Sequence, residues 1–333
     1  MGAVPTPVTD ARPLPNLATV LAATRLTAGL AVGGSTLRGR VRSVHRAAVY
    51  IDGPAPHGLL VVAIDDVGGV PDGILVLGPS DLRSMGIRPG MAVLPSIDGL
   101  AIPAVAVEID LSKAVSWSPT LPAGARLGPA VDPGRIADAR RRIAEARCLA
   151  AELARAGGLA PSAGLAPMLA GHAAPGDPWL ARAAALIDAQ LNAVRSGEVA
   201  AAIDPTIDLI GLGIGLTPSG DDYLVGFLAG LEATDHPARP ALAAAIAMHA
   251  PSRTTAVGAA ALDHATRGAY SERLHDVLVA LAGREQVDRV DDLARPVTRA
   301  MAYGATSGGD TLVGLFGALD LALAGSAGRG VAA

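Results

Sequence analysis

The rhythm of hydrophobic and polar positions changes along the chain and predicts two different parts. From residue 37 to 115, short apolar runs such as AAVYI, GLLVVAI and GILVLG alternate with clusters of Gly, Pro and Asp. Such alternation, at intervals of roughly ten residues, is typical of short strands joined by tight turns. We therefore expect a small β-barrel or sandwich-like unit that ends near Trp117.

Beyond a Pro- and Gly-rich connector the pattern becomes helical. Asp132 and Pro133 provide a helix N-cap and first turn. Further helical patterns follow near 179–195, 221–234, 239–249, 254–267, 271–283, 291–303 and 310–325. The predicted fold class is α+β, with an N-terminal tail and short helix (1–34), a β-rich domain (35–120) and a larger, mainly helical domain (130–330).

One long segment, 157–178, interrupts the helices and contains His172. It is rich in Gly, Ala and Pro. Loops of this length in compact domains are either mobile or functional. A lid over a binding site is one interpretation.

Composition excludes several classes of function. Half of the residues are hydrophobic but only 2% are aromatic, and the net charge is −4. Without a basic stripe or stacking aromatics, nucleic acid is excluded as a partner. Arg25 and Asp320 interrupt the two most apolar stretches, which argues against a membrane span. No secretory signal is read, so we expect a cytoplasmic protein. Cys148, the one cysteine, allows no internal disulfide and is interpreted as a core residue.

The strongest candidate site is the segment GLGIGLTPSGDD, residues 211–222. Its first part alternates glycines, which permit backbone conformations that side chains forbid. A glycine loop that runs into a helix start presents free N–H groups and the positive end of the helix dipole. The segment therefore predicts an anion-binding site.

Known nucleotide-binding loops do not fit this segment. The dinucleotide fingerprint requires glycine where Leu216 stands. A phosphate loop begun at Gly215 requires Lys and then Ser or Thr where Asp221 and Asp222 stand, so P-loop kinase chemistry is excluded. Two carboxylates would repel a bare phosphate. They suit a divalent cation, or an amide N–H or hydroxyl donor. Ser219 and Asp222 also have the spacing of a helix capping box.

A weaker copy of the motif follows near the C-terminus, where TSGGDTLVGLFGALD is similar to the earlier PSGDDYLVGFLAGLE. The two copies are 88 residues apart, measured from Ser219 to Ser307 (307 − 219). The matched pairs are Ser219 with Ser307, Gly220 with Gly308, Asp222 with Asp310, Leu224 with Leu312 and Gly226 with Gly314. Glycine one turn into each helix allows close helix contact. We expect the two helix starts to lie together and to face one cleft.

The segment between the copies adds a cation and hydroxyls. Arg253 and Thr254, at an expected helix start, offer a grip for an oxyanion. We expect Arg253 to reach the same cleft. His264 and His275 lack metal-ligand spacing and are interpreted as surface or core residues.

The combination GLGxGLTPSGDD, the Arg-Thr-Thr helix and GATSGGDTLVG resembles the family of the third subunit of bacterial oxamate carbamoyltransferase, an assembly of allantoin degradation. The resemblance covers residues 35–325. It implies two partner subunits and the interconversion of oxalurate plus phosphate with oxamate plus carbamoyl phosphate. The chain departs from the family pattern at Ile214, often proline, and at Ala305, often histidine, which leaves its own substrate open.

The residues and the resemblance together define the predicted site. Small anions such as carbamoyl phosphate and oxamate- or oxalurate-like molecules suit the loop and Arg253, and their amide groups suit the carboxylates. The predicted catalytic residues are Asp221, Asp222 and Asp310. The predicted substrate-binding residues are Gly211, Gly213, Gly215, Thr217, Ser219, Gly220, Arg253, Thr254, Ser307 and Gly308.

Two other functions compete with a carbamoyltransferase subunit. One is a non-catalytic ligand-binding or scaffolding subunit, with the chemistry in its partners. The other is a phosphotransferase that uses Mg²⁺ on the paired aspartates; no other cofactor is suggested.

Overall fold

A computed structural model describes residues 19–27, 38–53, 58–128, 133–154, 159, 178–283 and 291–325. The chain divides into two compact units. The first comprises Met1–Asp66 and Asp72–Ser116, and the second comprises Val67–Pro71 and Trp117–Ala333. Of the predicted lid segment, 157–178, only Leu159 and Pro178 are described, and His172 lies outside the described residues.

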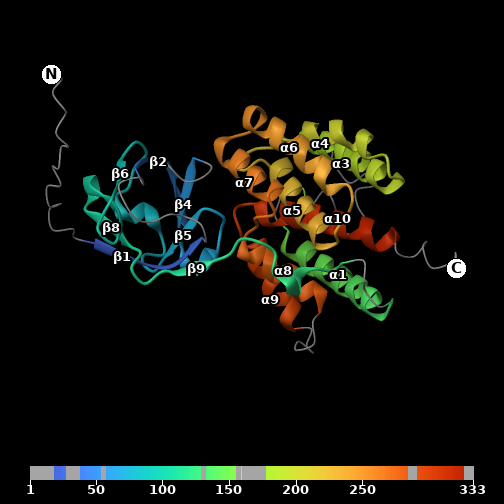
Figure 1. Ribbon diagram of the computed structural model, residues 1–333, viewed down its shortest axis with the longest axis horizontal. Coiled ribbons are helices and arrows are strands. Elements are labelled where there is room, and N and C mark those ends of the chain that lie inside the picture. The colour runs from blue at the N-terminus through green and yellow to red at the C-terminus, as the bar shows by residue number, and fades with distance from the viewer. Residues whose placement is uncertain are drawn as a thin grey trace, which may run out of the picture. The chain divides into compact units, whose positions relative to one another are not determined.

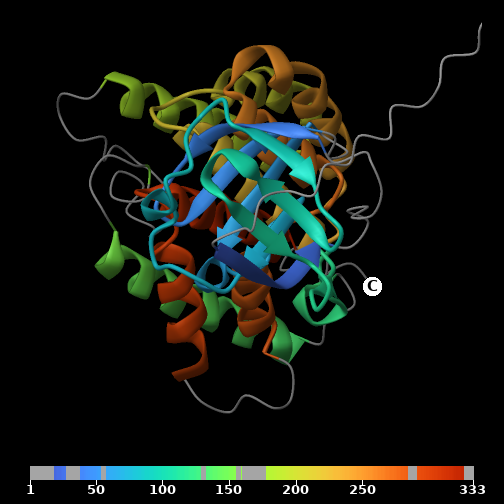
Figure 2. The same ribbon diagram turned by 90° about the vertical axis from the view of Figure 1, so that its left-hand side faces the viewer.

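The first unit is a β-barrel of eight strands, which confirms the predicted β-rich part of an α+β fold (Figures 1 and 2). The strands are β1 (Thr19–Thr27), β2 (Gly39–Val44), β3 (Ala48–Asp52), β4 (Leu59–Ile64), β5 (Gly73–Val76), β6 (Ala92–Pro95), β7 (Gly99–Ile102) and β8 (Val107–Asp110). They pair in the order β5-β4-β3-β2-β6-β7-β8-β1, and β1 pairs again with β5, which closes the ring. A short strand, β9 (Val115–Trp117), follows β1 in the sheet order.

Alternation along the strands fills the interior of the barrel. Val49 and Ile51 are both buried and lie two residues apart on β3. They share a core cluster with Val41 of β2 and Val62 of β4. Side chains two residues apart on a strand point to the same face, so this spacing directs the β-branched residues inward.

Strand β1 corrects the prediction of a short helix within residues 1–34. Its nine residues pair antiparallel with β5 and parallel with β8, and its buried positions include Leu21 and Ala23. Ala and Leu favour a helix, but an isolated helix of this length is marginal. Without β1 the ring would stay open and expose unpaired backbone groups of β5 and β8. Strand pairing therefore outweighs local propensity.

The second unit is helical, and Figure 1 shows its helices grouped together. The described helices are α1 (Pro133–Leu153), α3 (Pro178–Ser196), α4 (Ile203–Leu209), α5 (Ser219–Ala233), α6 (Arg239–Arg253), α7 (Ala256–Thr266), α8 (Glu272–Ala282), α9 (Asp291–Met301) and α10 (Ser307–Gly325). All but α4 were predicted. No described helix has both the length and the apolar character that crossing a membrane would require.

Helices α5 and α10 form the most extensive helix pair of the described residues, and glycines make the contact close. A Cβ on Gly226 would overlap the carbonyl of Thr311, and a Cβ on Gly314 would overlap the carbonyl of Tyr223. Both contacts join residues that are equivalent by the 88-residue interval (314 − 226 and 311 − 223). The helices therefore make a reciprocal contact, as two copies do around a two-fold axis.

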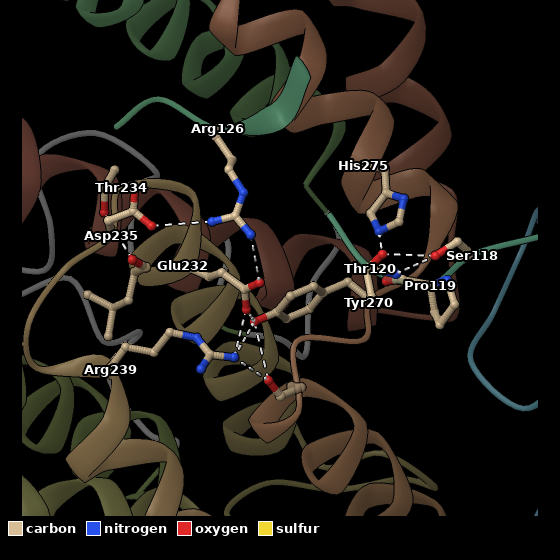
Figure 3. A network of polar contacts seen from close by, with 12 residues as sticks. Ser118, Pro119, Thr120, Arg126, Glu232, Thr234, Asp235, Arg239, Tyr270 and His275 are labelled. Atoms are coloured by element: carbon tan, nitrogen blue, oxygen red, sulfur yellow. Dashed lines mark hydrogen bonds and ion pairs between the residues drawn. The ribbon is translucent and has the colours of Figure 1, made fainter. Parts of the chain in front are cut away.

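The C-terminal end of α5 is held by a polar network (Figure 3). The carboxylate of Glu232 accepts a hydrogen bond from the Tyr270 hydroxyl at 2.9 Å and forms ion pairs with Arg239 at 2.7 Å and Arg126 at 3.6 Å. These groups come from α6, from the loop after α7 and from the connector before α1. The network fixes the end of α5 that lies away from its glycine loop.

Candidate functional site

The glycine loop before α5 adopts a backbone that only glycine takes without strain. Gly211, Gly213 and Gly215 have φ values of 76°, 114° and 106°. A Cβ on Gly211 would overlap the carbonyl of Arg253, and one on Gly213 would lie 2.8 Å from the Ser219 nitrogen. At Gly215 a Cβ would lie 3.9 Å from the Thr217 carbonyl oxygen, an ordinary contact, so the backbone conformation alone requires glycine there.

Asp221 ties this loop to the start of α7. One of its carboxylate oxygens accepts a hydrogen bond from the Gly211 N–H at 2.8 Å, and the other accepts one from the Thr254 hydroxyl. Burial raises the pKa of Asp221 to about 6, although both hydrogen bonds act to lower it. Because both oxygens are engaged, the geometry favours a positioning role for Asp221.

Thr255 also holds the loop, although it is not among the predicted site residues. Its side chain accepts a hydrogen bond from the Gly258 N–H at 2.9 Å and so caps α7, while its hydroxyl donates to the Leu216 carbonyl at 2.5 Å. The signal was available, since threonine before an apolar run is a favoured N-cap.

The start of α5 differs from the capping box that was considered. The helix begins at Ser219, its N-cap is Pro218, and no side chain caps it. The Pro218 carbonyl instead accepts hydrogen bonds from the N–H groups of Asp221 and Asp222, at 2.9 and 3.2 Å. The capping-box interpretation is therefore wrong, because the backbone already satisfies this turn.

The helix starts of α5 and α10 are built alike. A Cβ on Gly220 would overlap the carbonyl of Leu209 at the end of α4, and one on Gly308 would overlap that of Ala300 near the end of α9. The Gly220 N–H donates to the Leu212 carbonyl at 2.8 Å, and the Gly308 N–H donates to the Tyr303 carbonyl at 3.1 Å. The repeat thus extends back to the preceding loop and helix.

The two helix starts lie close together, as predicted, whereas Ser219, Asp222 and Asp310 are buried and the shared cleft stays a prediction. Thr217 Oγ1 lies 3.1 Å from Ser307 Oγ, and both residues are partly exposed. Ile214 and Gly215 of the first loop and Gly304 and Ala305 of the second are exposed, so both loops reach the surface.

Buried carboxylates lie beneath these hydroxyls. Burial raises the pKa of Asp222 well above its usual value, and the charges of Asp310 and Asp221 add to the effect. The hydroxyls of Ser307 and Thr217 act in the opposite direction. Asp310 is fully buried and accepts a hydrogen bond from the Leu159 N–H at 2.5 Å. Oδ2 of Asp222 is buried and has no hydrogen-bond partner among the described residues.

Arg253 lies beside the loop but not at a helix start as predicted. It is the last residue of α6, and Thr254 is the C-cap of that helix. Its guanidinium forms an ion pair with Asp208 of α4 at 3.0 Å, which directs its charge toward another carboxylate. The Arg253 carbonyl, rather than its side chain, approaches Gly211.

Other candidate groups lie elsewhere. His264 and His275 are both buried, and His275 Nε2 lies 3.1 Å from the Pro119 carbonyl oxygen (Figure 3). Cys148 is exposed, not a core residue, because α1 turns Ile143 and Ala146 inward instead. Within the described part of the chain, no group of three or more His, Cys, Asp or Glu residues is arranged to hold a metal ion.

One protein-family model matches part of the helical unit. Residues 209–319 match the family model of oxamate carbamoyltransferase subunit AllH. The AllH match begins at the last residue of α4 and ends within α10, so it contains both helix starts. Over these residues it supports the family that the motifs indicated. No curated protein and no solved structure matched the chain.

Proposed function

We propose that this protein is a subunit of an oxamate carbamoyltransferase-type assembly and that the starts of α5 and α10 bind a small anionic substrate with a carbamoyl or carboxamide group. The AllH match supports the class of assembly. Two partner subunits and substrates such as carbamoyl phosphate and oxamate are part of the proposal.

The observation that carries the proposal is the convergence of the two helix starts. Thr217 and Ser307 place their hydroxyls 3.1 Å apart above the buried Asp222. The Ser-Gly-x-Asp copies thus build one site rather than two separate helix ends. Hydroxyls can both donate and accept hydrogen bonds, which suits a polar, unsymmetrical ligand.

Backbone N–H groups supply the anion-binding part. Those of Gly213, Ile214, Gly215 and Leu216 have no hydrogen-bond partner among the described residues. They precede the N-terminus of α5, where the helix dipole favours negative charge. A carboxylate or phosphate held by these groups needs no lysine, which fits a loop whose nearby arginine is already paired with Asp208.

The carboxyl groups supply the part of the site that binds the amide of the substrate. A substrate amide has N–H and C=O groups, and the carboxyl of Asp222 lies next to the hydroxyls at the centre of the site. Transfer of a carbamoyl group depends on positioning and on stabilising a developing oxyanion. The arrangement can provide both without a nucleophilic side chain.

Calorimetry on the full chain tests the proposal. Oxamate, carbamoyl phosphate and inorganic phosphate are titrated with and without Mg²⁺, first into the chain alone and then into the assembly with its partner subunits. We expect binding of oxamate or carbamoyl phosphate without Mg²⁺. Binding that requires Mg²⁺ would favour the phosphotransferase. An absence of binding by the chain in both settings would leave the scaffolding function.

A further inference from the structure

Asp222 and Asp310 occupy equivalent positions in the two copies of the motif (310 − 222 = 88). Asp222 is the fourth residue of α5 and Asp310 the fourth of α10. Their exposed fractions are 6% and 0%, and the charge of Asp310 acts directly on Asp222. The reciprocal packing of α5 and α10 thus brings one carboxyl group from each copy to the same buried place.

Asp222 has no charge partner to offset its burial. Among the described residues it forms no ion pair, and its Oδ2 has no hydrogen-bond partner. An isolated carboxylate is costly to bury, and two neighbouring carboxylates cannot both ionise readily. The groups that face Asp222 are Asp221 of α5, Asp310 of α10 and the hydroxyls of Thr217 and Ser307. None of them carries positive charge.

The surroundings distinguish the two members of the pair. Oδ1 of Asp310 accepts the backbone N–H of Leu159 at 2.5 Å, and a backbone donor favours the ionised carboxylate. Asp222 lies against hydroxyls, which can accept a hydrogen bond as well as donate one. The negative charge is therefore better placed on Asp310 and the proton on Asp222.

We propose that Asp222 and Asp310 hold one proton between them at neutral pH, and that Asp222, as the protonated member, donates a hydrogen bond from Oδ2 to the carbonyl oxygen of a carboxamide or carbamoyl ligand. This inference rests on the proposed function. It adds that Asp222 recognises a neutral carbonyl group of the ligand, next to the anionic group that the loop binds. It also explains how an acidic motif can serve an anion site, since a protonated Asp222 does not repel the ligand.

The pH dependence of oxamate binding tests the pair. Oxamate keeps its single negative charge through the neutral and alkaline range, so a change in affinity reports the protein. As pH rises beyond the point where the pair loses its proton, the affinity of the wild-type chain should fall by about tenfold per pH unit. Asp222→Asn keeps an N–H donor and removes the titration, so its affinity should stay constant over the same range. Asp222→Ala should bind weakly throughout.

The matched control is Asp138→Asn, on the exposed face of α1, where the carboxylate pairs with Arg141. It should reproduce the wild-type pH profile. A wild-type affinity that does not change with pH, or an Asp222→Asn profile that follows the wild type, would overturn the inference while leaving the binding site itself intact.

A ligand-free measurement separates the two proposals. If Asp222 is protonated in the folded protein, Asp222→Asn should unfold at the same temperature as the wild type at neutral pH and at a higher temperature in alkaline buffer. A lowered unfolding temperature of Asp222→Asn at neutral pH would contradict the proton-holding pair. If neither oxamate nor carbamoyl phosphate binds at any pH, the proposed function fails, and this thermal comparison still decides the protonation of Asp222.

Discussion

Thr217 Oγ1 lies 3.1 Å from Ser307 Oγ, although 90 residues separate them in sequence. Ser307 is the equivalent of Ser219, whereas Thr217 has Ala305 as its equivalent (305 − 217 = 88). The contact is therefore made by the longer first loop reaching across to the second helix start. The contact joins the two similar but not identical copies of the motif, and the proposed site lies at this contact.

The loop backbone should be essential for binding but not for folding. Gly213→Val introduces a β-branched side chain at a φ of 114° and against the Ser219 nitrogen. We expect more than about tenfold weaker binding of oxamate or carbamoyl phosphate, which corresponds to at least about 1.4 kcal/mol. Calorimetry measures the affinity, and circular dichroism checks that the barrel remains folded.

The control for this change is Gly197→Val, in the same helical unit. Gly197 has a φ of 83° and no atoms near its Cβ position, so it tests backbone strain away from the site. It should lose some stability but keep its affinity. Unchanged affinity in Gly213→Val would remove the loop from the binding site.

Close packing of α5 and α10 should not tolerate a methyl group at the crossing. Gly226→Ala places a Cβ onto the Thr311 carbonyl, so the helices must separate. We expect a loss of about 1–3 kcal/mol in the free energy of unfolding, measured by urea denaturation. In Gly124→Ala the added Cβ meets only Val279 at 3.7 Å, so this variant should be nearly neutral. Equal stability of the two variants would contradict the close crossing.

Turnover should depend on Asp222 more than folding does. In the assembly with its partners, Asp222→Asn keeps a hydrogen-bond donor, but an amide N–H is a much weaker acid than a carboxyl group and stabilises a developing oxyanion less. We expect kcat to fall by about 10²-fold or more. Initial rates with oxamate and carbamoyl phosphate measure this effect. A wild-type kcat in this variant would show that the carboxyl group of Asp222 does not stabilise the transition state.

Asp221 should make folding stability depend on pH. Its pKa is raised to about 6 in the folded protein, above the value of an unfolded aspartate, so the folded state binds the proton more tightly. Stability from this group is fully present below about pH 4 and is lost as pH rises to about 6, by about 2–3 kcal/mol. Asp221→Asn should remove this decline.

Urea unfolding between pH 4 and 7 measures the slope for the wild type and for Asp221→Asn. Asparagine can still accept from the Gly211 N–H, so the loop should keep its tie to α5. Identical slopes in both proteins would place the proton on another group.

Much of the site was predictable because its signals are local. Alternating glycines specify an unusual backbone, and the 88-residue repeat predicts equivalent helix starts. The remaining features of the site depend on tertiary contacts, which the sequence pattern does not reveal. Asp208, on a short helix that was not predicted, pairs with Arg253 and directs its charge away from the expected role. No sequence pattern near Arg253 indicates that partner.

The fold was predictable to a similar extent. The apolar runs of the barrel strands indicated strands wherever turns separated them. Strand β1 was missed because its Ala and Leu residues suit a helix, whereas pairing with β5 and β8 holds it extended. Ser219 has the residue type of an N-cap, yet the Pro218 carbonyl already satisfies that turn. In both cases backbone hydrogen bonds outweigh the local preference of the residue type: those to β5 and β8 for β1, and those to the Pro218 carbonyl at the start of α5.

The reciprocal contact of α5 and α10 lies within one chain, and this has a consequence for ligand orientation. In a dimer of identical subunits, a molecule on the two-fold axis meets the same groups twice and can bind in two opposed directions. Here the first loop has nine residues, 210–218, between α4 and α5, and the second has five, 302–306, between α9 and α10. An unsymmetrical molecule between them meets different groups at its two ends, so a single direction of binding is favoured and unproductive reversed binding is reduced.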